Sequence, residues 1–267
     1  MTSFISFINR TQVNIVKNIN PALSGAADMV TIDQSANSYL IRGQPIGIMY
    51  GYKVEGIYQS AAEIASSPKN AAFGVVPQPG DFKIQDTNGD GVIDAKDKTV
   101  IGNRLPKWLY GFNFRTGYKG FDLSALFQGI GHADIYLSRG TQPFPFAGLS
   151  QSWENRWTPQ NPSTTMPRLW LDRTGYNGST IEVNDASYWV QNRAYLRLKN
   201  LQLAYTIPKS LLAHTFVKTL RLYVNAQNLL TFTPLKDFDP ERQDQTQYAT
   251  SSLPQLKIFT AGLNVTF

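Results

Sequence analysis

Apolar and polar residues alternate along several stretches of the chain, as they do in β-strands that separate an apolar from a polar environment. Residues 109–118 place tyrosine and phenylalanine on one face and Asn113 and Arg115 on the other. Residues 121–128 repeat the pattern after a connection short enough for a tight turn, which predicts a hairpin. Further strands are expected over 4–16, 195–207 (with a phase change near Lys199-Asn200 that indicates a β-bulge), 220–228 and 259–267.

The connections between these expected strands are very unequal in length. The turn at 118–121 is tiny and the connection 207–219 is modest, whereas 17–107 and 138–188 are long. Outer-membrane β-barrels show this asymmetry, because their periplasmic turns are short and their extracellular loops are long. The pattern therefore favours an all-β fold made of strands of a large antiparallel transmembrane β-barrel, with apolar faces toward lipid and polar faces toward a wet lumen. A soluble β-sandwich is the alternative.

The order of the strands predicts which segments lie outside the membrane. If the 118–121 turn is periplasmic, the strands alternate in direction, the strand that begins at 121 runs to 137, and the segments 17–107 and 138–188 become extracellular. About six strands enclose no useful lumen, and an open sheet edge in lipid leaves backbone groups unpaired. We therefore expect residues 1–267 to be the C-terminal part of a barrel domain, a fragment rather than a closed barrel.

Composition narrows the functional classes further. The chain has no cysteine and only two histidines, which leaves little material for thiolate or imidazole metal sites or for a catalytic triad. A net charge of +6 permits contact with phosphates, but the basic residues are scattered, so no nucleic-acid partner is expected. No stretch approaches the ~18 apolar residues of a spanning helix. The N-terminus is not a secretory signal.

Residues 86–97, DTNGDGVIDAKD, have the ligand spacing of a twelve-residue calcium loop. Gly91 takes the sixth position, where the sharp turn needs a residue that tolerates positive φ. No helix is predicted on either side, so we interpret the loop as a static structural Ca²⁺ clip. An Asx-rich turn that binds no metal is the alternative. The expected ligands are Asp86, Asn88, Asp90, the backbone carbonyl of Val92, Asp94 and Asp97.

Two other groups of residues suggest chemistry. Asp237, Asp239 and Glu241 cluster in DFDPE, and paired carboxylates can hydrolyse glycosides. The Asp239-Pro240 step favours a solvated turn instead, so no enzyme activity and no catalytic residue are expected. Tryptophan rings in the 138–188 segment can stack on sugars or anchor loops near the membrane boundary, and we favour anchoring. The candidates for substrate contact are Trp153, Trp157 and Trp170.

Several blocks of the chain, in the same order, resemble the C-terminal third of SusC-like (SusC/RagA) TonB-dependent outer-membrane transporters. The ending GLNVTF is similar to the signal by which barrels are recognised for assembly, through Gly262, Val265 and Phe267. The blocks are RGQPIGIMYGYKVEGIYQ (42–59), PGDFKIQDTNGDGVIDAKDKTVIGN (79–103), PKWLYGFNFRTGYKGFDLSALFQG (106–129), NRWTPQNPSTTMPRL (155–169), YLRLKNLQLAYTIPKSLL (195–212) and LRLYVNAQNLLTFTPLKDFDPE (220–241).

The resemblance implies a barrel of roughly twenty-two strands in the outer membrane of a Gram-negative-type cell. It implies a SusD-like surface lipoprotein as partner, and import of glycans, peptides or other large nutrients. The family's plug domain and TonB box are absent from 1–267, so contact with the TonB complex is expected through a missing N-terminal part. This segment would then supply barrel wall, in contact with outer-membrane lipid, and extracellular loops. The alternative is a secreted, calcium-stabilised β module that binds carbohydrate.

Overall fold

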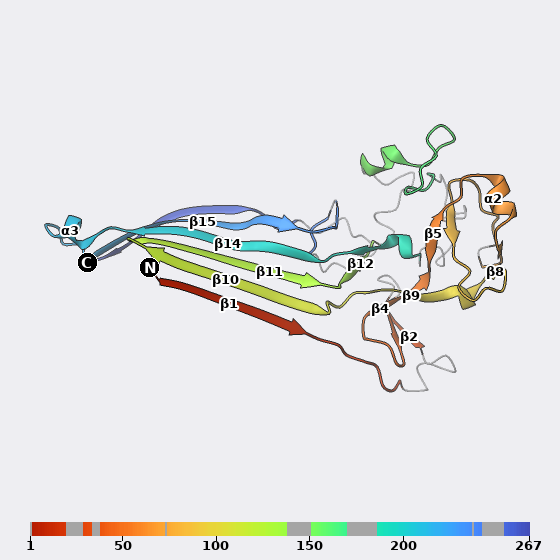
Figure 1. The fold of residues 1–267 in the computed structure, drawn as a ribbon, viewed down its shortest axis with the longest axis horizontal. Coiled ribbons are helices and arrows are strands. Elements are labelled where there is room, and N and C mark those ends of the chain that lie inside the picture. Colours follow the sequence, from red (N-terminus) through yellow and green to blue (C-terminus); the bar gives the residue numbers. More distant parts are fainter. Residues whose placement is uncertain are drawn as a thin grey trace.

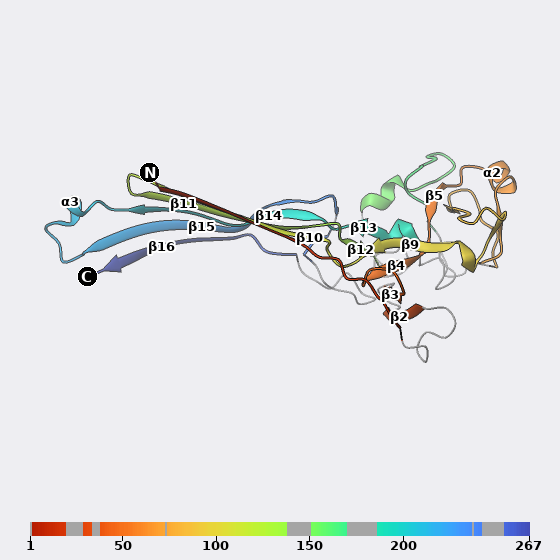
Figure 2. The same cartoon turned by 60° about the horizontal axis from the view of Figure 1, so that its bottom comes forward.

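The computed structural model describes residues 2–19, 29–33, 38–72, 74–137, 151–169, 186–236, 238–241 and 254–267. It has two parts, a long antiparallel sheet and a group of small sheets and short helices beyond one end of it (Figure 1). Both marked chain ends lie toward the opposite end of the long sheet. Figure 2 shows that this sheet twists along its length, as β-sheets do. No helix among the described residues is long and apolar enough to cross a membrane.

The long sheet contains six strands and confirms the expected all-β, open-barrel architecture. Each neighbouring pair is antiparallel, and the sheet does not close, because β1 and β16 form its two edges. In spatial order the strands are β1 (Thr2–Thr11), β10 (Trp108–Tyr118), β11 (Phe121–Gly131), β14 (Tyr195–Thr206), β15 (Thr219–Phe232) and β16 (Ile258–Thr266).

Local details of the long sheet agree with the sequence pattern, with two exceptions. Lys119 and Gly120 both have positive φ, 48° and 87°, as a two-residue hairpin turn requires. The register of β14 shifts between Leu198 and Asn200, where a bulge was expected. The first strand is shorter than the expected 4–16, because it ends at Thr11. The expected strand 121–137 is interrupted after Gly131, and its last part, β12 (Asp134–Tyr136), pairs with β13 (Val190–Asn192) in a separate sheet.

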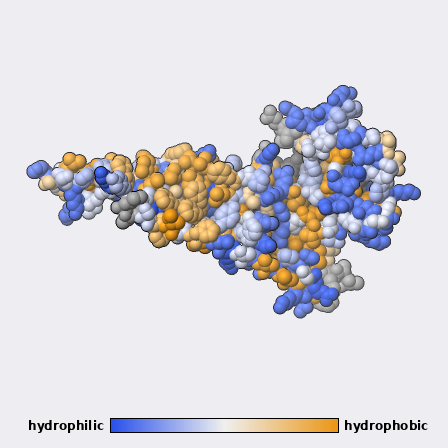
Figure 3. Space-filling model, in the orientation of Figure 1, coloured by the Kyte–Doolittle hydropathy of each residue, from blue (hydrophilic) through white to orange (hydrophobic). Residues whose placement is uncertain are grey.

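The register gives the long sheet one apolar and one polar face. A row of apolar residues crosses five strands through Phe7, Phe112, Phe127, Leu198 and Leu230. The apolar face is not covered: Leu203 is 45% exposed and Val224 is 53% exposed. Figure 3 shows the resulting apolar band over the long sheet. On the opposite face a second row runs through Arg115, Ser124, Gln202, Asn225 and Thr260.

The second part of the structure, here called the outer module, consists of the described residues between 29 and 103 together with 151–169 and 186–192. Its largest sheet has the order β2 (Met29–Asp33), β3 (Ser38–Ile41), β4 (Ile48–Tyr52), β9 (Lys98–Asn103). The remaining elements are the pairs β5 (Val54–Ile57) with β7 (Phe82–Ile84) and β6 (Lys69–Asn70) with β8 (Val92–Ile93), the helix α2 (Ala61–Ala65) and the 3₁₀ turns at Ala95–Asp97, Gln151–Asn155 and Ser187–Trp189. A further short helix, α3 (Lys209–Leu212), lies in the segment that connects β14 to β15 of the long sheet.

The outer module has a hydrophobic core of its own, although the sequence pattern predicts only long loops here. Phe82 is fully buried and packs edge-on against Trp189, with ring centroids 6.0 Å apart. Asp81 is also fully buried, and Arg168 donates to it from Nε at 2.6 Å. This ion pair joins the 151–169 segment to the β5–β7 pair. The buried core residues are Tyr52, Phe82, Ile84, Ile93, Trp153, Ala186 and Trp189.

Candidate functional site

The first half of the calcium-like loop is wound by side-chain-to-backbone hydrogen bonds. The two carboxylate oxygens of Asp86 accept the N–H groups of Gly89 at 2.6 Å and Gly91 at 2.8 Å. Asn88 and Asp90 each accept an N–H two residues further on, both at 2.9 Å. These are the Asx turns that the metal-free interpretation expects. They do not exclude a cation, because each carboxylate oxygen keeps a further lone pair.

Asp97, the expected twelfth-position ligand, is the buried anchor of the loop. One carboxylate oxygen accepts the N–H of Thr87 and the other accepts that of Asp94, each at 2.8 Å. Burial alone would raise the pKa of Asp97, but these backbone donors outweigh it and hold the pKa below its usual range. Asp97 therefore ties the end of the loop to its beginning, whatever else it binds.

The loop offers the right donor atoms for a metal ion, but its side chains are not gathered into a complete coordination site. Every expected donor atom is an oxygen, which is what a hard cation such as Ca²⁺ requires. Within the described ranges, however, no three Asp, Glu, His or Cys side chains stand close enough together to hold a metal ion. The amide of Asn88 and the carbonyl of Val92 would have to complete the site. The calcium site thus stays a prediction.

The DFDPE segment forms a buried ion-pair cluster, so the solvated turn expected for Asp239 and Glu241 is wrong. Arg197, on β14, is 2% exposed and donates to both oxygens of Asp239, at 2.8 and 2.9 Å, and to Glu241 at 2.7 Å. Lys199 and Tyr195 also donate to Glu241, at 2.6 and 2.7 Å. We call these five residues the Arg197 cluster. Asp237 lies outside the described residues.

The electrostatics of the Arg197 cluster suit a structural tie rather than acid catalysis. Burial would raise the pKa of Asp239, but N–H donors of Gln255 and Glu241 and the Arg197 guanidinium hold it below its usual range. A general acid needs the opposite, a carboxyl whose pKa is raised. The cluster therefore holds the segment after β15 against β14. Sequence reasoning missed it because its cation lies 42 residues from Asp239.

Two of the three candidate tryptophans for substrate contact, Trp153 and Trp157, pack within the outer module instead of standing free. Trp153 is 6% exposed and belongs to the core. The indole N–H of Trp157 donates to Gln59 at 3.2 Å, and its ring covers Gly80, where a Cβ would meet Trp157 Cε3 at 2.5 Å. This placement agrees with the anchoring interpretation. Trp170 lies outside the described residues.

The expected assembly signal lies on and just after β16, the last strand of the long sheet. Gly262 pairs with Tyr223, whose hydroxyl occupies the space of a Cβ at this glycine, 2.5 Å away. Val265 pairs with Leu220. The ring of Phe267 stacks on Phe216 with centroids 5.5 Å apart. The geometry places these residues at the sheet edge, and their function in assembly stays a prediction.

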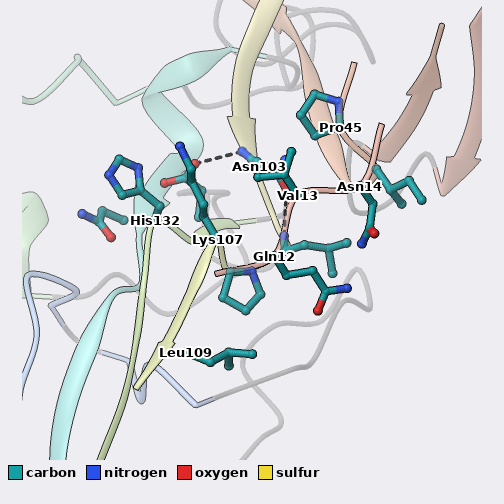
Figure 4. Close-up of a pocket in the computed structure, with 13 residues that line it drawn as sticks. Gln12, Val13, Asn14, Pro45, Asn103, Lys107, Leu109 and His132 are labelled. Atoms are coloured by element: carbon teal, nitrogen blue, oxygen red, sulfur yellow. Dashed lines mark hydrogen bonds between the residues drawn. The ribbon is translucent and has the colours of Figure 1, made fainter. Parts of the chain in front are cut away.

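A cavity of about 380 Å³ lies where β1, β10 and β11 meet the outer module (Figure 4). Its polar lining includes Asn14, Lys107, His132 and Asp134. Asp134 accepts the N–H of Asn103 at 2.9 Å, and burial raises its pKa despite that bond and the nearby charges of His132 and Arg193. No sequence pattern indicated this cavity, because its walls come from five separate segments.

Comparison with known proteins gives a consistent result. No family model matches the chain. Two TonB-dependent receptors of Formosa agariphila, P3 and P26, are each 31% identical to it, over 96% and 87% of this chain. The TonB-dependent receptor SusC of Bacteroides thetaiotaomicron is 24% identical over 68% of this chain. The chain spans about a quarter of the length of the Formosa relatives, 26% and 24%.

Solved structures show the same fold. The structures of the RagAB peptide importer in its "open-open" and "closed-closed" states align with 99% of this chain, with TM-scores of 0.65 and 0.70. The identity is 22%, and the alignments cover 26% and 27% of the RagAB chains.

Proposed function

Since this chain belongs to the SusC-like TonB-dependent receptors, we propose that it supplies six strands of barrel wall and an extracellular module to an outer-membrane nutrient importer. TonB-dependent receptors are outer-membrane proteins. The single observation that carries the proposal is the long sheet, which is antiparallel and open at both edges, with one apolar and one polar face. Lipid would cover the apolar face, and the polar face would line the lumen.

The uncovered apolar face argues against a secreted carbohydrate-binding module. A soluble sandwich packs the apolar face of each sheet against a second sheet. In the described part of the chain the apolar face is open instead, with Phe259 69% exposed and Leu263 61% exposed. A protein that stays in water rarely leaves so much contiguous apolar surface uncovered.

The two ends of the long sheet support an orientation in the membrane. The two-residue turn Lys119-Gly120 lies at one end, and the outer module lies beyond the other (Figure 1). Outer-membrane barrels have short turns on the periplasmic side and large loops outside. The outer module would therefore face the cell exterior.

The partner and the cargo are proposed from the relatives. A SusD-like surface lipoprotein would cover the extracellular side, and a glycan, peptide or other large solute would enter with energy from the TonB complex. The similarity to SusC and the shared fold with a RagAB peptide importer support this. The relatives are receptors and transporters, which fits a chain that is not an enzyme.

Fractionation of the intact receptor that carries this segment tests the proposal. We expect it in the outer-membrane fraction, bound to a surface lipoprotein encoded beside it, and we expect its deletion to abolish TonB-dependent uptake of one class of large solute. A receptor found in the soluble fraction, or one whose deletion leaves uptake of peptides and glycans unchanged, would contradict the proposal.

We further propose that the 86–97 loop holds a structural Ca²⁺ ion that stiffens the outer module. Calcium should raise the melting temperature of the intact receptor, with an affinity of roughly 10⁻⁴–10⁻³ M, as in other extracellular sites. The double variant Asp86→Ala, Asp90→Ala should lose that gain. Glu154→Ala, which removes an exposed carboxylate elsewhere in the outer module, should keep it. If millimolar calcium left the parent protein's melting temperature unchanged, the site would not exist.

A further inference from the structure

The segment that joins β14 to β15, residues 207–218, is longer than two adjacent antiparallel strands require. The turn between β10 and β11, at the same end of the long sheet, uses only Lys119-Gly120. We call residues 207–218 the α3 connection. Its first residue, Ile207, donates its N–H to the carbonyl of Leu220 at 2.9 Å, which extends the strand pairing into the connection. Figure 1 and Figure 2 both show α3 beyond the strand ends, near the C-terminus.

The α3 connection exposes large apolar side chains on the apolar side of the long sheet. Leu211 is 72% exposed and Phe216 is 80% exposed. The ring of Phe216 stacks on Phe267, which follows Leu263 and Val265 in the alternation that gives β16 its apolar face. The connection therefore lies toward the apolar face and away from the lumen. Because β14 and β15 are each paired on both sides, this exposure does not come from an unpaired sheet edge.

Aromatic residues mark the depth of this end of the sheet. Phe121 and Tyr205 pair across β11 and β14, with ring centroids 4.5 Å apart. Tyr118, beside the Lys119-Gly120 turn, pairs with Phe121 from the other side. In outer-membrane barrels such aromatic rows lie where the hydrocarbon meets the headgroups. Since Ile207 comes two residues after Tyr205, the α3 connection starts at the depth of the phospholipid headgroups.

The charge of the α3 connection is positive and uncompensated. Its two formally charged side chains are Lys209 and Lys218, and both are exposed. Neither side chain has an ion pair or a hydrogen bond within the described ranges. Asp122 lies near the same end, but it belongs to the polar face and is approached by Arg221, with Nε 4.0 Å from Oδ2. The connection thus offers two free ammonium groups beside exposed leucine and phenylalanine side chains.

We infer that the α3 connection binds the anionic phospholipid surface of the periplasmic leaflet. Leu211 and Phe216 would enter the boundary between headgroups and acyl chains, and the two lysines would pair with lipid phosphates. Apolar side chains next to basic ones are the composition that holds a segment in this interface, where apolar burial and attraction to anionic lipid add. The inference rests on the proposed function, because only a membrane-spanning wall brings the connection to this depth.

A local probe on the intact receptor tests the inference. A polarity-sensitive fluorophore is attached through Ala213→Cys, an exposed position next to α3 in a chain without cysteine. The receptor is reconstituted in vesicles of phosphatidylcholine alone, or of phosphatidylcholine and phosphatidylglycerol in equal parts. With phosphatidylglycerol, quenching by acrylamide, a neutral water-soluble quencher, should fall by a factor of roughly two or more. Molar salt should remove that difference, because it shortens the Debye length to about 3 Å.

Two lysine variants show whether the charge of the connection causes the protection. Each lysine near an anionic surface favours docking about fivefold, so Lys209→Gln with Lys218→Gln should lower the ratio of docked to free connection roughly thirtyfold and abolish the lipid dependence. Lys236→Gln is the matched control, since it removes an exposed lysine just beyond the opposite end of β15 and should change nothing at position 213. Heat-dependent electrophoretic mobility confirms that each variant compared is a folded barrel.

Equal quenching in both kinds of vesicle would overturn the inference, as would a difference that survives the loss of both lysines. Protection that appears only in cell envelopes, together with cross-linking of position 213 to a periplasmic protein, would assign the α3 connection to a protein partner and would also overturn it. These results come from receptor that has inserted into lipid, so they would leave the proposed function standing. A receptor that inserted into no vesicle would count against the proposed function, and the inference would fall with it.

Discussion

Replacing Arg197 with methionine is expected to lower the free energy of unfolding of the intact receptor by about 3–5 kcal/mol, the usual cost of breaking a buried ion pair from one side. The variant leaves the carboxylate of Asp239 without its cation, at 10% side-chain exposure. Glu241 loses one donor but keeps Lys199 and Tyr195. Denaturant unfolding of the receptor in detergent measures the loss.

Two further variants separate the charge effect from packing. Adding Asp239→Asn to Arg197→Met should recover part of the stability, because the carboxylate that lost its cation is then neutral while Glu241 still pairs with Lys199. Arg10→Met, at an exposed position on β1, should have little effect. If Arg197→Met unfolded at the same denaturant concentration as the parent, the Arg197 cluster would not stabilise the protein.

The stabilisation from Asp239 should also depend on pH. Its folded-state pKa is lowered, so its contribution is full above its ordinary pKa of about 4 and is lost as pH falls through the lowered folded value. The difference in stability between the parent and Arg197→Met should therefore shrink in strongly acidic solution.

Placing a charge on the apolar face should prevent stable insertion. Leu203 lies on that face, between Leu123 and Val224 on the neighbouring strands, and is 45% exposed. Leu203→Arg is expected to cost about 2–4 kcal/mol if this position lies near the bilayer midplane. The neighbouring substitution Gln202→Arg, on the polar face, should cost little.

The yield of folded receptor in the outer membrane, and its unfolding midpoint in lipid vesicles, measure this pair of variants. A large loss for Leu203→Arg beside a small one for Gln202→Arg is the expected result. Equal effects of the two substitutions would mean that the two faces of β14 meet the same environment.

The strands of the long sheet were predictable because their pattern is local. Apolar and polar residues alternate in β10, β11, β15 and β16 because one face of the sheet meets lipid or core and the other meets water. The bulge near Asn200 also shows in the sequence, as a change in the phase of this alternation. The end of β11 at Gly131 was not visible in the sequence. The residues that follow pair with Val190–Asn192, a distant segment, and so form a separate sheet.

The outer module and the sites were less predictable, for a different physical reason. Its strands are as short as Lys69–Asn70, too short to show a period, and its core joins residues from three separate segments. The spacing of 86–97 is visible in sequence because all its donors lie within twelve residues. By contrast, the turn residues of DFDPE suggested that its carboxylates are exposed to solvent. Only the folded structure brings Arg197 next to Asp239 and buries this pair.

The most direct test of the central claim, that the long sheet is barrel wall between lipid and a wet lumen, uses spin labels along β15. The chain has no cysteine, so each label introduced here through a single cysteine is unambiguous within it. In receptor reconstituted in lipid, labels at Leu222 and Val224 should be accessible to dissolved oxygen, and those at Tyr223 and Asn225 to a water-soluble nickel chelate. Accessibility to the nickel chelate at all four positions would contradict the account.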